Sequence, residues 1–478
     1  MSDDQREAIR ANAKYLRHVR PIDPDEIAEY VEGYPHPGVV RRVLREEAFD
    51  LGLRERTDGT FVPASEGPIE PTFDGVEAFP EPYAAVLEEL LVERHGPEWA
   101  DGETGDRLRH VIRDLKEEYY RQRPVVYDED AALGYACYHL PDYYAAIQYV
   151  LHELGTAGLL PATLRVLDVG AGVGGPALGL VDYLGDEALV DYHAVEPSAA
   201  TTVLESLLAE TGPNVHATVH STTIEAFEPD GEYDLIIAAN VLSELDDPVT
   251  TLERLLPSLS DDGALVTLAP ADKHTSIGLR EVERELVDAP SEYDVFSPTL
   301  RLWPGESPTD RGWSFDVKPD LAVPAFQRRL DEGRRAGPEE RDPATGEFVN
   351  VDVQYSYAII RRDGVRRVAF DPSPKRFAKL AETERHVTDR INVAAVKLSH
   401  SLSEAGANPV YKVGDGSESI DHYAVLTRET SLNSALRTAD YGDVLVLERV
   451  LALWNDDEEA YNLVVDDETI VDAIPAGE

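Results

Sequence analysis

The sequence predicts an α/β protein whose central domain is a parallel sheet with helices on both faces. Between residues 163 and 270, short apolar runs alternate with amphipathic helical segments. The first apolar run ends in a glycine-rich turn that opens a helix. From about residue 390, β-rich runs separated by turn residues predict a small barrel. The chain therefore contains more than one domain.

Five apolar runs supply the strands of the central sheet, and helical segments separate them. A chain of 478 residues exceeds what one hydrophobic core usually organises. The strands are expected in LRVLDVG, LVDYHAVEP, NVHATVHST, YDLIIAANVLSEL and GALVTLAP. We expect a helical or winged-helix region over 1–80, a helical lead-in over 81–160, the α/β domain with an arginine-rich extension over 161–385, and a β-barrel, with the OB type as candidate, over 386–478.

The N-terminal region leaves two interpretations open. Residues 24–63 carry two helical patterns and then a hairpin with the turn signal Asp58-Gly59. This order fits a winged helix, whose second helix would present Arg41, Arg42 and Arg45 to nucleic acid. It fits equally a helical cap whose arginines form a solvated face.

The chain is strongly acidic, with 92 Asp and Glu against 44 Lys and Arg and a formal net charge of −48. The acids are dispersed over amphipathic segments, and only 8 residues are Lys. This pattern is typical of a halophilic surface adapted to molar salt rather than of a disordered chain. At about 1 M salt the Debye length is about 3 Å, so the charge does not exclude RNA as a partner. DNA and membranes are not expected as partners.

Cysteine content and the N-terminus indicate a cytoplasmic protein. Cys137 is the single cysteine, which excludes an internal disulfide and any multi-cysteine zinc or iron–sulfur site. The opening MSDDQREAIR has no apolar segment of a signal peptide, and no run approaches the ~18 apolar residues of a membrane span. No metal site is expected.

The glycine-rich turn after the first strand predicts a ligand site. Its sequence, Asp168-Val-Gly-Ala-Gly-Val-Gly-Gly, lets the backbone approach a ligand closely, although dinucleotide sites and structural bends use similar turns. An acid at the end of the second strand can accept both hydroxyls of a ribose. The order D-x-G-x-G-x-G favours S-adenosylmethionine (SAM) over NAD. The predicted SAM-binding residues are Asp168, Gly170, Gly172, Gly174, Glu196 and Asn240.

Four segments occur in the order seen in one family: DEDAALGYACYHLPDYYAAIQYVLHEL, LRVLDVGAGVGGPALG, YDLIIAANVLSELDDP, and WSF followed by VDVQYSYAIIRRDG. Over about residues 120–370 the chain resembles the methyltransferase-like proteins associated with the mitochondrial small ribosomal subunit, which include bacterial and archaeal members. The resemblance implies a Rossmann-like class I SAM methyltransferase fold. It also implies action on small-subunit ribosomal RNA, in subunit assembly or in translation. The family keeps a Ser-Glu pair after the fourth strand, so Asn240, Ser243 and Glu244 are the catalytic candidates.

The chain departs from this family in one stretch. Family members carry four cysteines that resemble an iron–sulfur ligand set, whereas residues 295–316 here contain none, so no cluster is expected. Packing of Phe296, Trp303, Trp313 and Phe315 is expected to hold the stretch instead. The sequence does not indicate which atom accepts the methyl group or whether the protein is catalytically active. The alternatives to an rRNA methyltransferase are a non-catalytic SAM-binding assembly factor and a small-molecule methyltransferase.

Residues 327–379 break the acidic pattern, with 12 Arg and Lys against 9 Asp and Glu. The cations come in pairs, which suits contacts with successive phosphates. The alternative is that they form ion pairs with the neighbouring acids. The RNA-binding candidates are Arg328, Arg329, Arg361, Arg362, Arg366 and Arg367.

Overall fold

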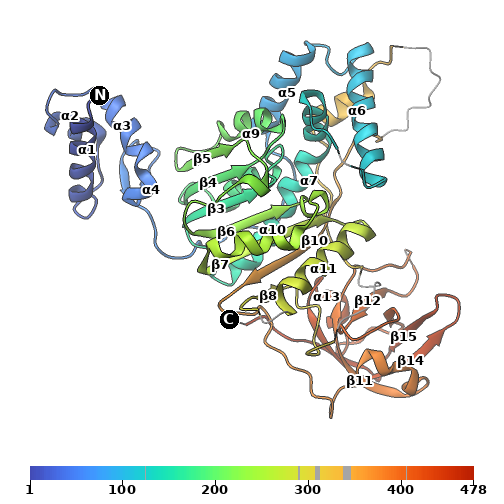
Figure 1. Cartoon of the computed structure of the whole chain (residues 1–478). Coiled ribbons are helices and arrows are strands. Elements are labelled where there is room, and N and C mark those ends of the chain that lie inside the picture. The colour runs from blue at the N-terminus through green and yellow to red at the C-terminus, as the bar shows by residue number, and fades with distance from the viewer. Residues whose placement is uncertain (124, 289–290, 307–312, 337–345, 405, 478) are drawn as a thin grey trace. The chain divides into compact units, whose positions relative to one another are not determined.

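The computed structural model divides into two compact units (Figure 1). It describes residues 1–123, 125–288, 291–306, 313–336, 346–404 and 406–477. Unit 1 comprises Met1–Ala239, Ser258–Ser260 and Asp320–Val353, and unit 2 comprises Asn240–Pro257, Asp261–Pro319 and Gln354–Glu478. The division splits the α/β region expected over 161–385, because the chain returns to unit 1 after residue 320.

Unit 1 begins with helices and a hairpin, as the sequence predicts for residues 24–63. A capping box between Ser2 and Gln5 starts the first helix, and proline at the first turn starts the next two. Backbone hydrogen bonds in both directions join Ile22 to Phe61 and add a rung to the hairpin. This is the element order that a winged helix requires. The elements are α1 (Asp3–Leu16), α2 (Pro24–Tyr30), α3 (Pro37–Glu46), α4 (Ala48–Leu51), β1 (Leu53–Glu55) and β2 (Phe61–Pro63).

Three long helices lead into the sheet: α5 (Glu81–His95), α6 (Gly102–Tyr120) and α7 (Glu129–Thr156). Helix α7 contains Pro141, which has no N–H to donate to the carbonyl of Cys137. The Gln327 amide, on α12 (Ala325–Glu332), donates to that carbonyl at 2.9 Å. The Asn350 amide donates to the neighbouring carbonyl of Tyr138 at 3.1 Å. Residues from the 320–353 segment therefore satisfy the backbone at the proline.

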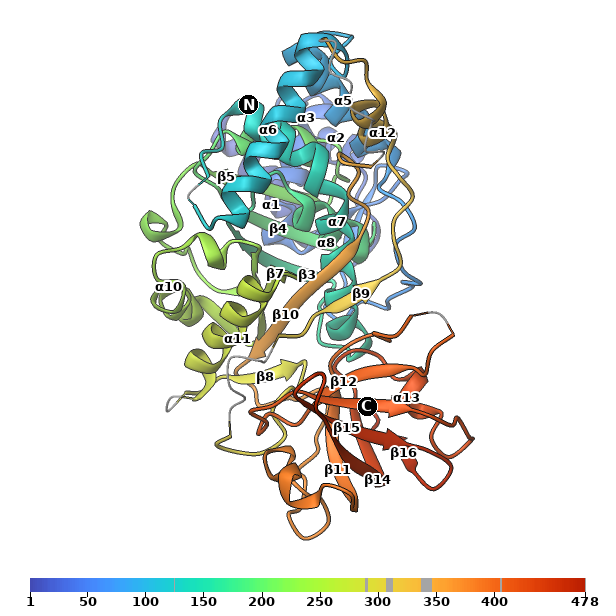
Figure 2. The ribbon, with the colours of Figure 1, turned by 90° about the vertical axis from the view of Figure 1, so that its right-hand side faces the viewer.

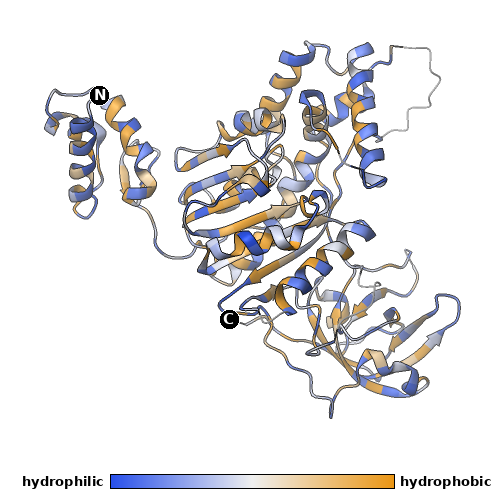
Figure 3. Ribbon diagram, viewed as in Figure 1, coloured by the Kyte–Doolittle hydropathy of each residue, from blue (hydrophilic) through white to orange (hydrophobic). Residues whose placement is uncertain are grey.

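The sheet of unit 1 has four parallel strands in the order β5-β4-β3-β6. Strands β3, β4 and β6 are mostly buried, as a parallel sheet covered on both faces requires, and Figure 3 shows the hydrophobic character of β6. Strand β5 is only partly buried. Parallel strands bring their carboxyl ends to one edge. The elements are β3 (Thr163–Val169), α8 (Gly175–Leu184), β4 (Leu189–Val195), α9 (Ala200–Leu208), β5 (Val215–His220) and β6 (Tyr233–Ala239).

In unit 2 the strands that follow are antiparallel: β10 lies between β7 and β8, and β9 also pairs with β10. The sequence pattern predicts β7 but not β8, β9 or β10. The elements are α10 (Pro248–Leu255), β7 (Leu259–Pro270), α11 (Lys273–Asp288), β8 (Asp294–Ser297), β9 (Asp316–Lys318) and β10 (Val353–Arg361). Short 3-10 turns are η1 (Ile224–Ala226), η2 (Leu242–Glu244), η3 (Leu256–Ser258) and η4 (Leu380–His386).

The C-terminal part of unit 2 is the predicted five-stranded barrel (Figure 2). Its strands pair in the order β11-β12-β13-β15-β14, and β14 pairs again with β11 to close the ring. The final segment forms two strands rather than one, and β16 pairs with β14 outside the ring. The elements are β11 (Arg390–Lys397), β12 (Val410–Gly414), β13 (His422–Leu426), α13 (Ala435–Thr438), β14 (Val444–Asn455), β15 (Ala460–Val465) and β16 (Ile470–Ala473).

Packing holds most of the cysteine-free stretch, as expected. Phe296 and Trp303 are buried, and the Trp303 indole donates to Asp415 at 2.8 Å. Trp313 departs from the expectation, because 37% of it is exposed while its ring contacts Phe315. Residues 307–312 of this stretch lie outside the described residues. None of the helices in the described ranges has the length and apolar character needed to cross a membrane.

Candidate functional site

The glycine turn connects β3 to α8 at the carboxyl edge of the parallel sheet. Gly170, Gly172 and Gly174 all have positive φ, so each position strains any other residue. A Cβ added at Gly172 would meet only a carbonyl oxygen at 3.9 Å, which leaves open space for a ligand. A Cβ at Gly174 would instead meet Leu204 at 2.7 Å. Gly174, predicted to bind the cofactor, is therefore explained by close packing on α9.

Glu196 follows β4 at the same edge and is buried. One carboxylate oxygen accepts a hydrogen bond from the Gly172 N–H at 3.0 Å, and the other accepts one from the Ser198 N–H at 2.9 Å. These bonds fix the carboxylate beside the glycine turn. A carboxylate oxygen can accept more than one hydrogen bond, so both oxygens remain available to a pair of ribose hydroxyls.

Asp168 is fully buried near the end of β3, directly before the glycine turn. The Tyr192 hydroxyl donates to Oδ2, while Oδ1 has no hydrogen-bond partner among the described residues. Burial, with the Glu196 charge adding to it, raises the pKa of Asp168 to about 7. An unpartnered buried carboxylate oxygen is costly unless a donor or cation meets it. The ammonium group of SAM fits this requirement, and Asp168 is among the predicted SAM-binding residues.

Binding of SAM is expected to release a proton from Asp168. With its pKa raised to about 7, the free protein holds this proton below neutrality, whereas an adjacent ammonium favours the carboxylate. SAM affinity should therefore rise with pH up to about 7 and then level off. The number of protons released per site should be large at pH 6 and close to zero at pH 8.5. Calorimetry in buffers of different ionisation enthalpy measures this number, and Asp168→Asn should abolish it. The same release from the variant would exclude Asp168.

The catalytic candidates after β6 belong to unit 2. Asn240 has positive φ, and its N–H donates to the Leu268 carbonyl at 2.9 Å. Ser243 and Glu244, both exposed, lie in the 3-10 turn η2. Asn240 and Ser243 line a cavity of about 390 Å³ between this turn, the end of β7 and helix α11. The role of Asn240 in SAM binding stays a prediction.

The arginine candidates are largely engaged in ion pairs, which is the alternative that the sequence left open. Arg361 is 1% exposed and bonds to Asp363, so its guanidinium does not reach the surface. Arg329 bonds to Glu88 at 2.8 Å, Arg362 to Asp261 at 2.7 Å and Arg366 to Asp294 at 3.3 Å. Arg328 is exposed and donates to a backbone carbonyl. The interaction of the Arg367 side chain with RNA stays a prediction.

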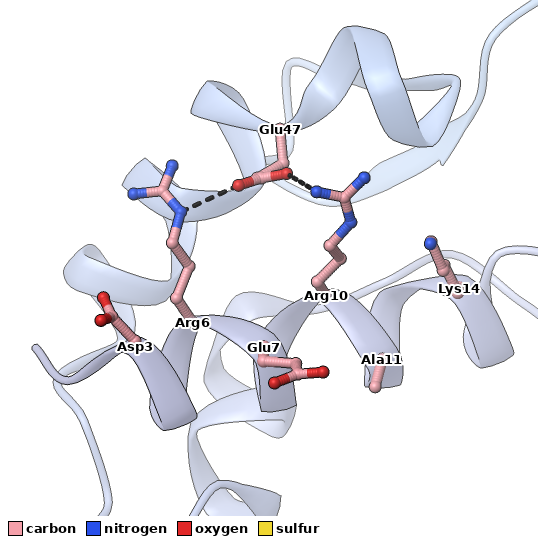
Figure 4. Close-up of a pocket in the computed structure, with 7 residues that line it drawn as sticks. All are labelled: Asp3, Arg6, Glu7, Arg10, Ala11, Lys14 and Glu47. Carbon is pink, nitrogen blue, oxygen red and sulfur yellow. Dashed lines mark hydrogen bonds and ion pairs between the residues drawn. The ribbon is translucent and has the colours of Figure 1, made fainter.

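A separate hollow of about 450 Å³ lies along α1 (Figure 4). Arg6 and Arg10 both reach the Glu47 carboxylate, each at 2.8 Å, so these cations already have a counter-charge. None of the predicted site residues lines this hollow. Across the described ranges, no group of three or more His, Cys, Asp or Glu side chains is arranged to hold a metal ion.

Comparison with family models agrees with this site. Residues 167–265 match a model described as a methyltransferase domain, and they include the glycine turn and Glu196. The chain carries a SAM-dependent methyltransferase domain. Residues 6–57 and 381–474 match the N-terminal and C-terminal domains of a family of unknown function, DUF8157. These two matches fall on the N-terminal helices with strand β1 and on the barrel.

Similar solved structures include methyltransferases. Two complexes of the plantazolicin methyltransferase BpumL match, one over 42% of this chain and 66% of that chain (18% identity, TM-score 0.24) and one over 58% and 98% (13%, 0.29). A putative methyltransferase from Thermoplasma acidophilum matches over 43% of this chain and 70% of its own (12%, 0.27). These scores add no argument about function. No curated protein matches the chain.

The sequence pattern did not predict two residues that shape the predicted SAM site. Tyr192 supplies the hydroxyl that bonds Asp168, and the Ser198 N–H holds Glu196. No local signal singles out Tyr192, because Asp191 and His193 flank it in β4 and are polar too. Its buried hydroxyl needs a partner, and Asp168 is within reach because β3 and β4 lie side by side in the sheet.

Proposed function

We propose that this chain transfers a methyl group from SAM to the RNA of the small ribosomal subunit. The observation that carries the proposal is the buried carboxylate of Asp168, whose Oδ1 has no partner among the described residues, beside a glycine turn that Glu196 braces. This combination suits a ligand with both an ammonium group and a ribose. In such a site Asp168 and Glu196 bind and orient the donor, and SAM supplies the electrophilic methyl group.

The two flanking modules support a nucleic acid as acceptor. We assign the barrel to the OB type, because its first strand β11 pairs with both β12 and β14, while β13 and β15 run parallel. In many proteins, OB barrels and winged helices are the modules that bind nucleic acids. A small-molecule methyltransferase needs neither module. Exposed Arg328 and the solvent-facing Arg366 stay candidates for phosphate contacts.

The test uses radiolabelled SAM, in molar KCl, with small subunits purified from cells with and without the gene. Subunits from cells lacking the gene should accept about one labelled methyl group each in their RNA, and subunits from normal cells almost none, because the position is already methylated. Glu196→Ala should slow transfer at low SAM, since hydrogen bonds to a charged group contribute about 1.5–3 kcal/mol.

Two outcomes contradict the proposal. Calorimetric SAM binding without label in any RNA favours a non-catalytic SAM-binding assembly factor. Label that appears in small molecules of a cell extract, and not in subunits, identifies a small-molecule methyltransferase.

A further inference from the structure

Four rings form a continuous row on and just before α7, which we call the aromatic shelf: Tyr127, Tyr135, His139 and Tyr143. Ring centroids lie 5.5 Å apart between Tyr127 and Tyr135, and 5.0 Å apart between Tyr135 and His139. His139 stacks on Tyr143 at 5.0 Å with an interplanar angle of 10°. All four are only partly buried. A partly open row of rings offers stacking surface for another ring.

The shelf runs beside the donor site, and both lie in unit 1. At one end, the Tyr127 carbonyl accepts a hydrogen bond at 3.3 Å from Ala199, three residues after Glu196. At the other end, a Cβ added at Gly175 would lie 3.0 Å from the Tyr143 Cβ. Gly175 is the last residue of the glycine turn and the first residue of α8. The shelf therefore spans from the ribose-binding acid to the start of α8.

His139 in this shelf is paired with a buried carboxylate. Its Nδ1 lies 3.4 Å from Oδ2 of Asp142, which is 9% exposed. Oδ1 of Asp142 has no hydrogen-bond partner in the part of the chain that is described. Burial raises the pKa of Asp142, so a neighbouring positive charge stabilises its ionised form. A proton arriving on His139 supplies that charge.

The other contacts of His139 come from the Asn350 amide, which also bonds the backbone just before Pro141. The Asn350 amide lies 3.3 Å from Nδ1 of His139 and also bonds the Tyr138 carbonyl. Among the described residues, Nε2 of His139 has no hydrogen-bond partner, and 29% of the side chain is exposed. In the tautomer whose Nδ1–H faces the Asp142 carboxylate, the Asn350 amide bonds the Tyr138 carbonyl and not Nδ1, and Nε2 carries a lone pair that can accept a proton.

We propose that the aromatic shelf is the acceptor subsite, which takes a planar base ring bearing an N–H, and that His139 removes the proton from that nitrogen. This inference rests on the proposed methyl transfer to RNA. The acceptor nitrogen attacks the methyl carbon of SAM and forms an N–C bond. The C–S bond breaks, and its electron pair stays on sulfur to give S-adenosylhomocysteine (SAH). The N–H proton passes to Nε2 of His139. The Asp142 carboxylate disfavours phosphate at this position and favours the resulting imidazolium.

The first measurement is single-turnover transfer to small subunits lacking the modification, at saturating SAM. His139→Gln should lower the rate constant about 10²-fold or more, the usual contribution of a positioned base. SAM affinity should change less than twofold. His110→Gln is the matched control, because this exposed histidine on α6 lies outside the shelf and should leave the rate unchanged. A normal rate for His139→Gln overturns the inference. A loss of SAM affinity in this variant also overturns it, because His139 would then be a residue that binds SAM.

The second measurement needs no turnover. The NMR signal of His139 in SAH-loaded protein, identified by its loss in His139→Gln, should shift with adenosine or cytidine but not with ribose 5-phosphate. Tyr135→Leu should weaken the shift. An unchanged signal with both nucleosides contradicts a ring-binding shelf. Ring binding without transfer to subunits leaves the subsite standing and contradicts the rRNA acceptor, so the two proposals fail separately.

Discussion

Gly179→Ala is expected to destabilise unit 1 by about 2–3 kcal/mol, the usual scale of overpacking in a tight core. Alanine at a helix interior normally gains about 1 kcal/mol over glycine. At Gly179, on α8, an added Cβ would overlap both Ile147 Cγ2 and the backbone oxygen of Tyr144 on α7. A backbone oxygen cannot move aside as a flexible side chain can, so the two helices must separate. Equilibrium unfolding at fixed molar salt measures the change.

Gly278→Ala is the matched control, because this glycine also lies inside a helix, α11, and a Cβ there would meet nothing within 4 Å. It should stabilise the protein by about 0.5–1 kcal/mol, since alanine loses less backbone freedom on folding. If Gly179→Ala stabilises the protein to the same extent, the close approach of α7 and α8 is wrong.

Folding is expected to depend strongly on salt. A net charge of −48 on one chain opposes the compact state when the charges are not screened. The Debye length shortens from about 10 Å at 0.1 M to about 3 Å at 1 M salt, so repulsion falls steeply across this range. The melting temperature should rise by about 10 °C or more between 0.1 and 2 M KCl.

Sucrose is the control that distinguishes charge screening from the stabilisation that any excluded solute gives. It is excluded from the protein surface but carries no charge. It should stabilise the protein far less than KCl does at low ionic strength. Equal effects of sucrose and KCl, or a melting temperature that does not change with KCl, would mean that charge repulsion does not govern stability.

The strands of the parallel sheet were predictable because burial on both faces leaves a local signature. YDLIIAA is a continuous apolar run, and β6 occupies it. Strand β10 was not predicted, although it is buried, because its partner β7 lies about ninety residues earlier. No local pattern encodes a pairing at that separation. The barrel was predicted from its turn spacing, but its closure depends on β11 pairing with β14, which is also non-local.

In the predicted SAM site too, residues marked by a local pattern were predictable and those placed by distant segments were not. Asp168, Gly172 and Glu196 sit where a short motif places them, since each is fixed by its position at the end of a strand. Arg361 was an RNA-binding candidate because it belongs to an arginine pair in a locally basic stretch, yet the end of β10 buries it with Asp363. The spacing of His139 and Asp142 is visible on a helix, but Asn350, whose amide lies against the imidazole, is 211 residues away.

The proline in α7 also constrains the order in which unit 1 can mature during synthesis. A ribosome completes α7 and every strand of the unit 1 sheet before Gln327 and Asn350 exist. Until then the carbonyls of Cys137 and Tyr138 lack the amides that bond them in the finished fold. Residues 240–257 and 261–319, which belong to unit 2, are made in the interval. Unit 1 therefore cannot complete its folding before the synthesis of unit 2 begins, because residues 320–353 of unit 1 are made only after the first residues of unit 2.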